Sequence, residues 1–308
     1  MTLGHHRWVT SEPTIPFDVG ILYEDADIVV IDKPHFLPTT PRGMWYRQTA
    51  LMRLRQRYHD DAITPAHRLD RATAGVVVFV RNPAMRGMFQ MLFQNHETCK
   101  TYECIAPLAP IDEHRGGRSI TGITDPLAPP RAFPLRRSSH ITKLRGVIQA
   151  FEEPGVINAV TDIDVADCQE AAVQTAAVQT AAIQVAAVQT AASETEDNSA
   201  VEAPHIPLAP LGLRAYRLQP LTGKTHQLRV HMNALGLPML GDDIYPRLID
   251  RPYDDFSMPL QLVARELRFT DPRNGTPRIF RSRVPLTVPG EMLPMLSGGW
   301  LSSRRLPS

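Results

Sequence analysis

The hydrophobic positions of the chain fall into short runs that predict strands. Residues 21–23 and 28–32 are two such runs, separated by the polar turn Glu24-Asp25-Ala26-Asp27, and this arrangement predicts a strand pair. Residues 75–80 form a continuous apolar run, which is typical of a strand buried on both faces. The same reasoning predicts strands over residues 100–106, 141–150, 213–219, 261–269 and 278–284.

Helical spacing of apolar residues predicts helices over residues 49–58, 82–93 and 225–235. The second begins at Asn82-Pro83, a favourable start because Asn caps the first turn and Pro fits its first position. Strands and helices follow each other irregularly. This order predicts an α+β fold rather than a doubly wound parallel sheet.

Residues 155–205 differ from the rest of the chain. They contain eight acidic residues and no Lys or Arg, and from Ala171 onward they repeat a five-residue Ala-Ala-Val-Gln-Thr unit. A period of five fits neither a helix nor a strand, so we expect a flexible, low-complexity insertion. The predicted organisation is an N-terminal tail (1–20), a single catalytic domain (21–154 and 206–290), the insertion (155–205) and a C-terminal tail (291–308).

Charge and composition narrow the class of protein. The net charge of the 308 residues is only +1, but without residues 155–205 there are 33 basic and 24 acidic residues. Such a balance suits an anionic partner such as nucleic acid, although an arginine-rich solvated surface gives the same count. With 43% hydrophobic and 21% charged residues, the chain is expected to be globular.

Targeting and cysteine signals point to a cytoplasmic protein. The three cysteines are too few for a disulfide framework and form no Cys-x-x-Cys pair, which fits a reducing compartment and argues against structural zinc. No apolar run is long enough to cross a membrane, and the first residues contain no apolar leader. We therefore expect no membrane partner.

The first candidate site is His67-Arg68-Leu69-Asp70-Arg71, which lies just before the apolar run at 75–80. A carboxylate beside arginines at the mouth of a buried strand stays ionised while it is partly removed from water. Such a carboxylate is a candidate nucleophile. An ordinary ion pair at a strand end explains the same local sequence.

Two further clusters carry candidate chemistry. Lys100-Thr101-Tyr102 opens a predicted strand, and a tyrosine there is suited to stack on a base or to move a proton. Residues 221–231 read Leu-Thr-Gly-Lys-Thr-His-Gln-Leu-Arg-Val-His. They lack the first glycine of a phosphate-binding loop, and His226 and His231 lie on different sides of a helix, so one metal ion does not bind both. The unspecific interpretation of this cluster is an anion site at a helix N-terminus.

Together the three clusters resemble the RluA-type pseudouridine synthases, which convert uridine in RNA to its C-glycoside isomer. His-Arg-Leu-Asp-x-x-Thr-x-Gly, Lys-x-Tyr and Thr-Gly-Lys-Thr-His-Gln-Leu-Arg-Val-His match the family's motifs in order. Supporting matches are Tyr23-Glu24-Asp25 leading to Asp32-Lys33-Pro34, and residues 236–245. The resemblance implies a mixed, largely antiparallel sheet with flanking helices and a central catalytic cleft.

The resemblance also implies a role for each motif residue. Asp70 is the expected catalytic aspartate, Arg229 the arginine that pairs with it, and Tyr102 the tyrosine that contacts the target base. Arg68 is expected to fill the gap left by the flipped nucleotide and Leu228 to press against the base, while His67 and Arg71 are further expected substrate contacts. Arg42, Arg53 and Arg57 are candidate phosphate contacts. No metal and no redox or nucleotide cofactor is expected, because isomerisation exchanges no electrons and needs no group donor.

The expected partner is a structured RNA, ribosomal or transfer RNA, bound by a monomer. Asp70 would detach the uracil, which turns over and rejoins the sugar through carbon 5. Attack at C1′ and proton removal giving a glycal are both compatible first steps. Two other functions remain open: a catalytically silent RNA-binding protein on the same scaffold, and a nucleoside or glycoside hydrolase, for which Asp242 or Asp243 would supply the second acid.

Overall fold

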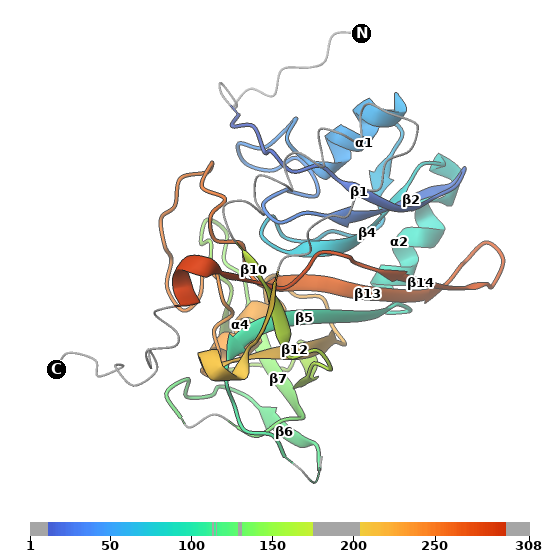
Figure 1. Cartoon of the computed structure of the whole chain (residues 1–308). Coiled ribbons are helices and arrows are strands. Elements are labelled where there is room, and N and C mark those ends of the chain that lie inside the picture. Colours follow the sequence, from blue (N-terminus) through green and yellow to red (C-terminus); the bar gives the residue numbers. More distant parts are fainter. Residues whose placement is uncertain (1–11, 113, 115, 129–130, 175–203, 294–308) are drawn as a thin grey trace. The chain divides into compact units, whose positions relative to one another are not determined.

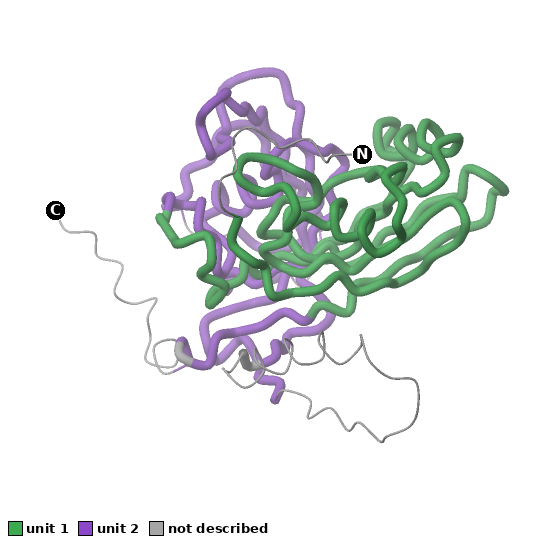
Figure 2. Tube along the Cα trace, turned by 90° about the horizontal axis from the view of Figure 1, so that it is seen from above, with its two compact units in different colours: residues 1–102, 249–284 green, residues 103–248, 285–308 purple. Residues whose placement is uncertain are grey.

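The computed structural model describes residues 12–112, 114, 116–128, 131–174 and 204–293 (Figure 1). Strands dominate, few helices accompany them, and most strand pairs are antiparallel. The predicted α+β fold with a mixed, largely antiparallel sheet is confirmed. The chain divides into two compact units: residues 1–102 with 249–284, and residues 103–248 with 285–308 (Figure 2). The single catalytic domain stays a prediction.

The first unit is built on a sheet with a core on both faces. Its strands follow the order β1-β2-β4-β13-β5, with β3 on β4 and β14 on β13. Their bounds are β1 Gly20–Glu24, β2 Ile28–Lys33, β3 Thr64–Pro65, β4 Ala74–Val80, β5 Cys99–Pro107, β13 Leu262–Thr270 and β14 Pro277–Arg281. Every residue of β2 and β4 is buried, as the continuous apolar run predicts.

Two helices supply the cores on either side of this sheet. The helix α1 (Ala50–Tyr58) packs Leu51 and Leu54 against one face of β2 and β4. The helix α2 (Arg86–Gln94), entered through a short 3-10 turn η1 (Pro83–Met85), packs Phe89 and Leu92 on the other side. Thr49 and Asn82 accept backbone N–H bonds at the two starts. The cap predicted at Asn82 is confirmed, and Thr49 is a second cap.

The predicted N-terminal tail is wrong for residues 12–19. Ile15 is buried in the core beneath α1, and the Glu12 carboxylate accepts the backbone N–H groups of Tyr46, Arg47 and Gln48. Arg53 donates to the carbonyls of Ile15 and Phe17. These bonds fasten the segment to the first unit, and they use Arg53 internally instead of leaving it as a phosphate contact.

The main strands of the second unit follow the order β5-β12-β9-β7-β6, with β8 on β7. The strand β5 passes from one unit into the other at Tyr102. The bounds are β6 Arg118–Thr121, β7 Leu135–Thr142, β8 Phe151–Glu153, β9 Ala159–Val165 and β12 Leu213–Pro220. A helix, α4 (Gln227–Ala234), packs on this sheet through Gln227 and His231, which bond to Thr161.

A small second sheet and two 3-10 turns complete the second unit. They are β10 Glu170–Gln174, β11 His205–Pro207, β15 Thr287–Pro289, η2 Ala209–Leu211 and η3 Gly290–Met292. The strand β10 pairs with both β11 and β15. The predicted C-terminal tail, 291–308, stays a prediction: η3 includes its first two residues, and residues 294–308 lie outside the described chain.

The predicted insertion at 155–205 is wrong for most of its first twenty residues. The strand β9 lies between β7 and β12, with Thr161 and Ile163 buried. Its acidic residues alternate with these, and they pair with arginines on neighbouring strands, Asp162 with Arg136 and Asp164 with Arg217. The acidic character therefore belongs to one face of an ordered strand; residues 175–203, which carry most of the repeat, lie outside the described chain.

The strand predicted at 141–150 lies earlier in the sequence, at β7 (Leu135–Thr142). Its buried side chains include Arg137 and Ser139 between Leu135 and Ile141, so two polar residues interrupt the apolar alternation of its inward face. Arg137 pairs with Glu152 at 2.5 Å, and Ser139 lies 3.0 Å from the His231 ring. No helix among the described residues is long and apolar enough to span a membrane.

Candidate active site

The segment that carries Asp70 connects β3 to β4 and is anchored on both sides of that residue. The Thr39 hydroxyl donates to the Leu69 carbonyl at 2.8 Å and accepts the Leu69 N–H at 3.1 Å. The His35 ring donates through Nδ1 to the Ala72 carbonyl at 2.9 Å. Asp70 is half-buried between these anchors, so the backbone that positions its carboxylate is fixed.

Lys33 contacts the segment that carries Asp70 and was not selected from the sequence as a site residue. It ends β2 with a fully buried side chain, and its Nζ donates to the carbonyls of Pro34, Leu37 and Arg71. Burial lowers the pKa of Lys33 to about 7, against the opposing attraction of Asp70. The ammonium therefore joins the Asp70 segment to the end of β2. The available signal was Asp32-Lys33-Pro34, a charged residue closing an apolar strand.

His67 is held inside the same segment. Its ring stacks on Phe93 with centroids 4.1 Å apart, and its Nε2 accepts the Val78 N–H at 3.2 Å. Burial lowers the pKa of His67 to about 3, so the ring is neutral. These contacts give His67 a role in holding the segment; its predicted contact with substrate stays a prediction.

The two arginines beside Asp70 have different surroundings. Arg68 is exposed and forms no ion pair with any described residue, as a side chain that contacts RNA would be. The Arg71 guanidinium lies 4.9 Å from the Trp45 ring centroid, and its Nη2 donates to the Tyr253 carbonyl at 2.9 Å. Arg71 therefore has a packing role in the first unit.

Tyr102 lies near Asp70 within the first unit. Burial raises the pKa of the Tyr102 phenol, and the negative charge of Asp70 raises it further. The phenol is therefore protonated at neutral pH. A protonated phenol is better suited to contact the base than to remove a proton from it.

Arg229 lies on α4 with 2% of its side chain exposed. Its Nε and Nη2 donate to the two Asp242 carboxylate oxygens at 2.8 and 2.5 Å, and Nη2 also reaches Asp243 at 3.2 Å. The Asp242 Oδ1 accepts the N–H groups of Ile244 and Tyr245, each at 2.8 Å. Asp242 therefore fixes the plane of the guanidinium, a role that the sequence reasoning did not assign.

The predicted site residues thus divide between the units. Asp70 and Tyr102 lie together in the first unit with Lys33, while Arg229 and Leu228 lie on α4 in the second. The pairing of Asp70 with Arg229 stays a prediction. Leu228 is buried, as the packing stripe of a helix requires, and its contact with the base stays a prediction too.

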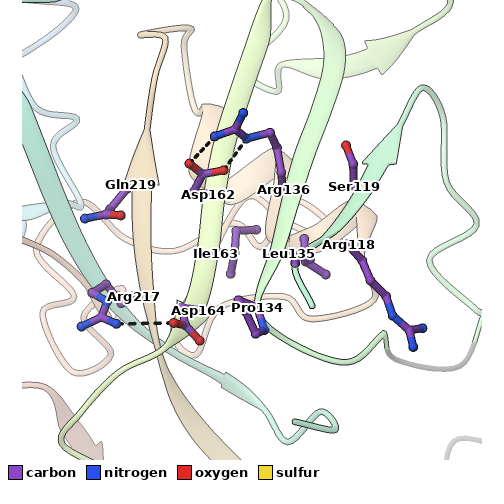
Figure 3. A pocket seen from close by; sticks show the side chains of 11 residues that line it. Arg118, Ser119, Pro134, Leu135, Arg136, Asp162, Ile163, Asp164, Arg217 and Gln219 are labelled. Atoms are coloured by element: carbon purple, nitrogen blue, oxygen red, sulfur yellow. Dashed lines mark hydrogen bonds and ion pairs between the residues drawn. The ribbon is translucent and has the colours of Figure 1, made fainter. Parts of the chain in front are cut away.

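A groove of about 490 Å³ opens on the sheet of the second unit (Figure 3). It contains none of the predicted site residues. Two of its three arginines are paired with acids on neighbouring strands. Arg136 makes two bonds to Asp162, at 2.6 and 2.7 Å, and Arg217 reaches Asp164. The groove is therefore not the predicted catalytic cleft.

The two histidines of the third motif, His226 and His231, both contact other side chains of the second unit. His226 contacts the Tyr245 hydroxyl at 3.1 Å, and His231 lies between Thr161 and Ser139. In the described part of the chain no group of three His, Cys, Asp or Glu side chains is arranged to hold a metal ion.

Comparison with known proteins identifies the family. The RNA pseudouridylate synthase family profile matches residues 27–234. The dual-specificity RNA pseudouridine synthase RluA of Haemophilus influenzae is 26% identical over 275 residues, which cover 89% of this chain and 96% of that protein. Human pseudouridylate synthase RPUSD2 is 26% identical over 242 residues, or 78% of this chain, and the chain spans about a third of that relative, 32%.

Solved structures agree on the fold. Human RNA pseudouridylate synthase domain containing 1 is 20% identical with a TM-score of 0.53, covering 94% of this chain and 90% of its own. Human RNA pseudouridylate synthase domain containing 4 is 21% identical with a TM-score of 0.51, covering 86% and 88%. The motif resemblance is confirmed: this chain belongs to the RNA pseudouridylate synthase family, whose members are isomerases that act on RNA.

Proposed function

We propose that this protein converts uridines in structured RNA to pseudouridine and that Asp70 is its catalytic carboxylate. One observation carries the assignment to Asp70: the residue is half-buried in a segment whose backbone is fixed at Leu69, Arg71 and Ala72. A carboxylate that attacks a sugar must be held within a fraction of an ångström of its target. A surface ion pair needs no such support.

In this proposal a uridine turns out of the RNA stack before it reacts, since its glycosidic bond is inaccessible inside a helix. The Asp70 carboxylate then acts at the sugar, as a nucleophile at C1′ or as a base that gives a glycal, and the uracil is released. The uracil turns over, carbon 5 bonds to C1′ and loses its proton, and N1, freed from the sugar, takes up a proton. The sugar, the base and their electrons are all retained, so the step needs no co-reactant.

Other residues support this chemistry by position. The protonated Tyr102 phenol contacts the uracil face near Asp70. Exposed Arg68 occupies the gap that the displaced nucleotide leaves, and Arg229 is the proposed partner of the Asp70 carboxylate. Arg42 and Arg57 are proposed phosphate contacts. Ribosomal or transfer RNA is the proposed substrate of a cytoplasmic monomer.

The surroundings of Asp242 argue against the alternative function of a nucleoside or glycoside hydrolase. A glycoside hydrolase needs a second carboxyl group that exchanges a proton. The Asp242 carboxylate is 1% exposed and bound by Arg229 and two backbone N–H groups. With its oxygens occupied by these donors and almost no exposure, Asp242 is poorly placed to exchange a proton with a substrate. Asp243, at 36% exposure, is the only one of the two that solvent reaches.

Pseudouridine mapping tests the proposal. Cellular RNA from cells with and without the protein is treated with a pseudouridine-specific reagent and sequenced. We expect one or more modified positions to vanish without the protein and to return when the wild-type gene, but not Asp70→Asn, is restored. An unchanged map would contradict the proposed function, and restoration by Asp70→Asn would contradict the role of Asp70.

A further inference from the structure

Residues 143–148, Lys-Leu-Arg-Gly-Val-Ile, form an exposed tip between β7 and β8 in the second unit. All six are exposed, including the apolar Leu144 at 50%, Val147 at 41% and Ile148 at 55%. The tip contains two cations and no acid. Apolar side chains gathered in water are unfavourable by about 25 cal/mol per Å², and contiguous ones mark an interaction surface.

The tip has a definite shape of its own. The Val147 N–H donates to the Leu144 carbonyl at 3.3 Å, which closes a turn, and Gly146 has a φ of +84° within it. The Lys143 ammonium donates to the Val147 carbonyl. Arg145 forms no ion pair with any residue that the structure describes.

The base of the tip is fastened to the residues that hold Arg229. The Tyr245 hydroxyl accepts the Ala150 N–H and donates to the Ala150 carbonyl, both at 2.8 Å. Gln149 donates to the Ile244 carbonyl at 2.6 Å. The Tyr245 ring centroid is 5.4 Å from the Arg229 guanidinium carbon, and the Tyr245 N–H donates to Asp242. The tip is therefore connected through one tyrosine to the motif arginine.

These features fit a nucleic acid whose bases are partly unstacked. Phosphates bind a cation such as Arg145, and unstacked bases offer apolar faces to side chains such as Leu144 and Ile148. A reaction that turns a uridine out of its stack creates such bases beside the target. A purely apolar partner would leave the two cations unused, and a bare phosphate would leave the apolar side chains in water.

We propose that the tip at 143–148 is an RNA-contacting element, with Arg145 on a phosphate and with Leu144, Val147 and Ile148 against unstacked bases of the substrate RNA. The proposal rests on the proposed function. It assigns substrate binding to residues outside the three sequence motifs.

The test compares tip variants with matched surface variants of the full chain. The tip variants are Ile148→Ser and Arg145→Ala. The controls are Ile279→Ser and Arg281→Ala, exposed by 50% and 66% on β14 of the first unit. Binding is measured by fluorescence anisotropy with a fluorescein-labelled RNA stem-loop that carries uridines in its loop, over a series of salt concentrations. Circular dichroism checks that each variant is folded.

We expect each tip variant to raise the Kd about tenfold and each control to change it less than about twofold. Arg145→Ala should also reduce the slope of log Kd against log salt by about 0.7. Folded tip variants that bind RNA like the wild type would overturn the proposal, whether the tip is idle or binds another protein. Pseudouridine formation by the wild type on total RNA, measured in parallel, reports separately on the proposed function.

Discussion

Arg229 shows how one buried side chain depends on its surroundings. A guanidinium with 2% exposure loses most of its hydration, which costs several kcal/mol unless acids compensate. Asp242 provides that compensation with two bonds, and Asp243 adds a weaker, more exposed one. If Arg229 orients the catalytic carboxylate, Asp242 is the residue that orients Arg229.

This arrangement predicts unequal effects for two neighbouring acids. Asp242→Asn should lower kcat for pseudouridine formation about 100-fold, since a misplaced positioning group costs that much, while KM for RNA stays nearly constant. Asp243→Asn should change kcat less than about threefold, as an exposed contact would.

Single-turnover kinetics on the folded fraction separate positioning from stability. A purely structural Asp242 would lower the melting temperature of Asp242→Asn and leave kcat per folded molecule at the wild-type value. That result would contradict the positioning role.

At the scale of elements, the sequence pattern predicted strands well where apolar residues are buried on both faces. It predicted a helical start well where a capping residue could be named. The strands β2 and β4 and the start of η1 are examples. The prediction failed where the interior is polar. In β7 the buried Arg137 depends on Glu152, a partner fifteen residues away that a local pattern does not reveal.

The same contrast between local patterns and tertiary contacts applies to the candidate site residues. Asp70 and Tyr102 could be selected from the sequence because they lie in recognisable motifs. Lys33 and Asp242 were missed as site residues because their role lies in tertiary contacts: Lys33 reaches carbonyls on two segments, and Asp242 meets a helix thirteen residues earlier in the chain.

The junction of β4 and β13 gives an element-scale prediction. Gly75 has a φ of +115°, and a Cβ there would lie 2.3 Å from the Ala264 carbonyl oxygen of the paired strand. Gly75→Ala should therefore reduce the free energy of unfolding by about 3 kcal/mol.

Gly87 in α2 is the matched control for that change. A methyl group added at Gly87 would have no neighbour within 4 Å, and alanine favours helix, so Gly87→Ala should raise stability by about 0.5–1 kcal/mol. Urea unfolding compares the two variants. Equal stability of Gly75→Ala and the wild type would contradict the close approach of these strands.

At the scale of the whole molecule, buried histidines make the fold sensitive to acid. Burial lowers the pKa of His35 to about 4 and that of His67 and His231 to about 3. Below the ordinary histidine pKa of about 6.5 the unfolded chain binds protons that the folded chain does not, so stability falls as pH falls. Each histidine contributes a loss of up to about 2 kcal/mol between pH 6.5 and pH 5.

Both units contain such a histidine, so melting temperatures should drop for the entire protein between pH 7 and pH 5. His231→Gln should weaken this dependence. His114→Gln, at a position that is 96% exposed, should leave it unchanged. A melting temperature that is constant over this range would contradict the neutral, buried state of the three rings.

The central claim is that the Asp70 carboxylate breaks a glycosidic bond in RNA, and tritium release tests it most directly. RNA labelled with tritium at carbon 5 of uridine loses the label only when a new bond forms at that carbon. Wild-type protein, and Asp61→Asn at an exposed position nearby, should release tritium in step with pseudouridine formation. Asp70→Asn should be slower by at least about 1,000-fold. Release by Asp70→Asn at more than about a tenth of the wild-type rate would contradict the claim.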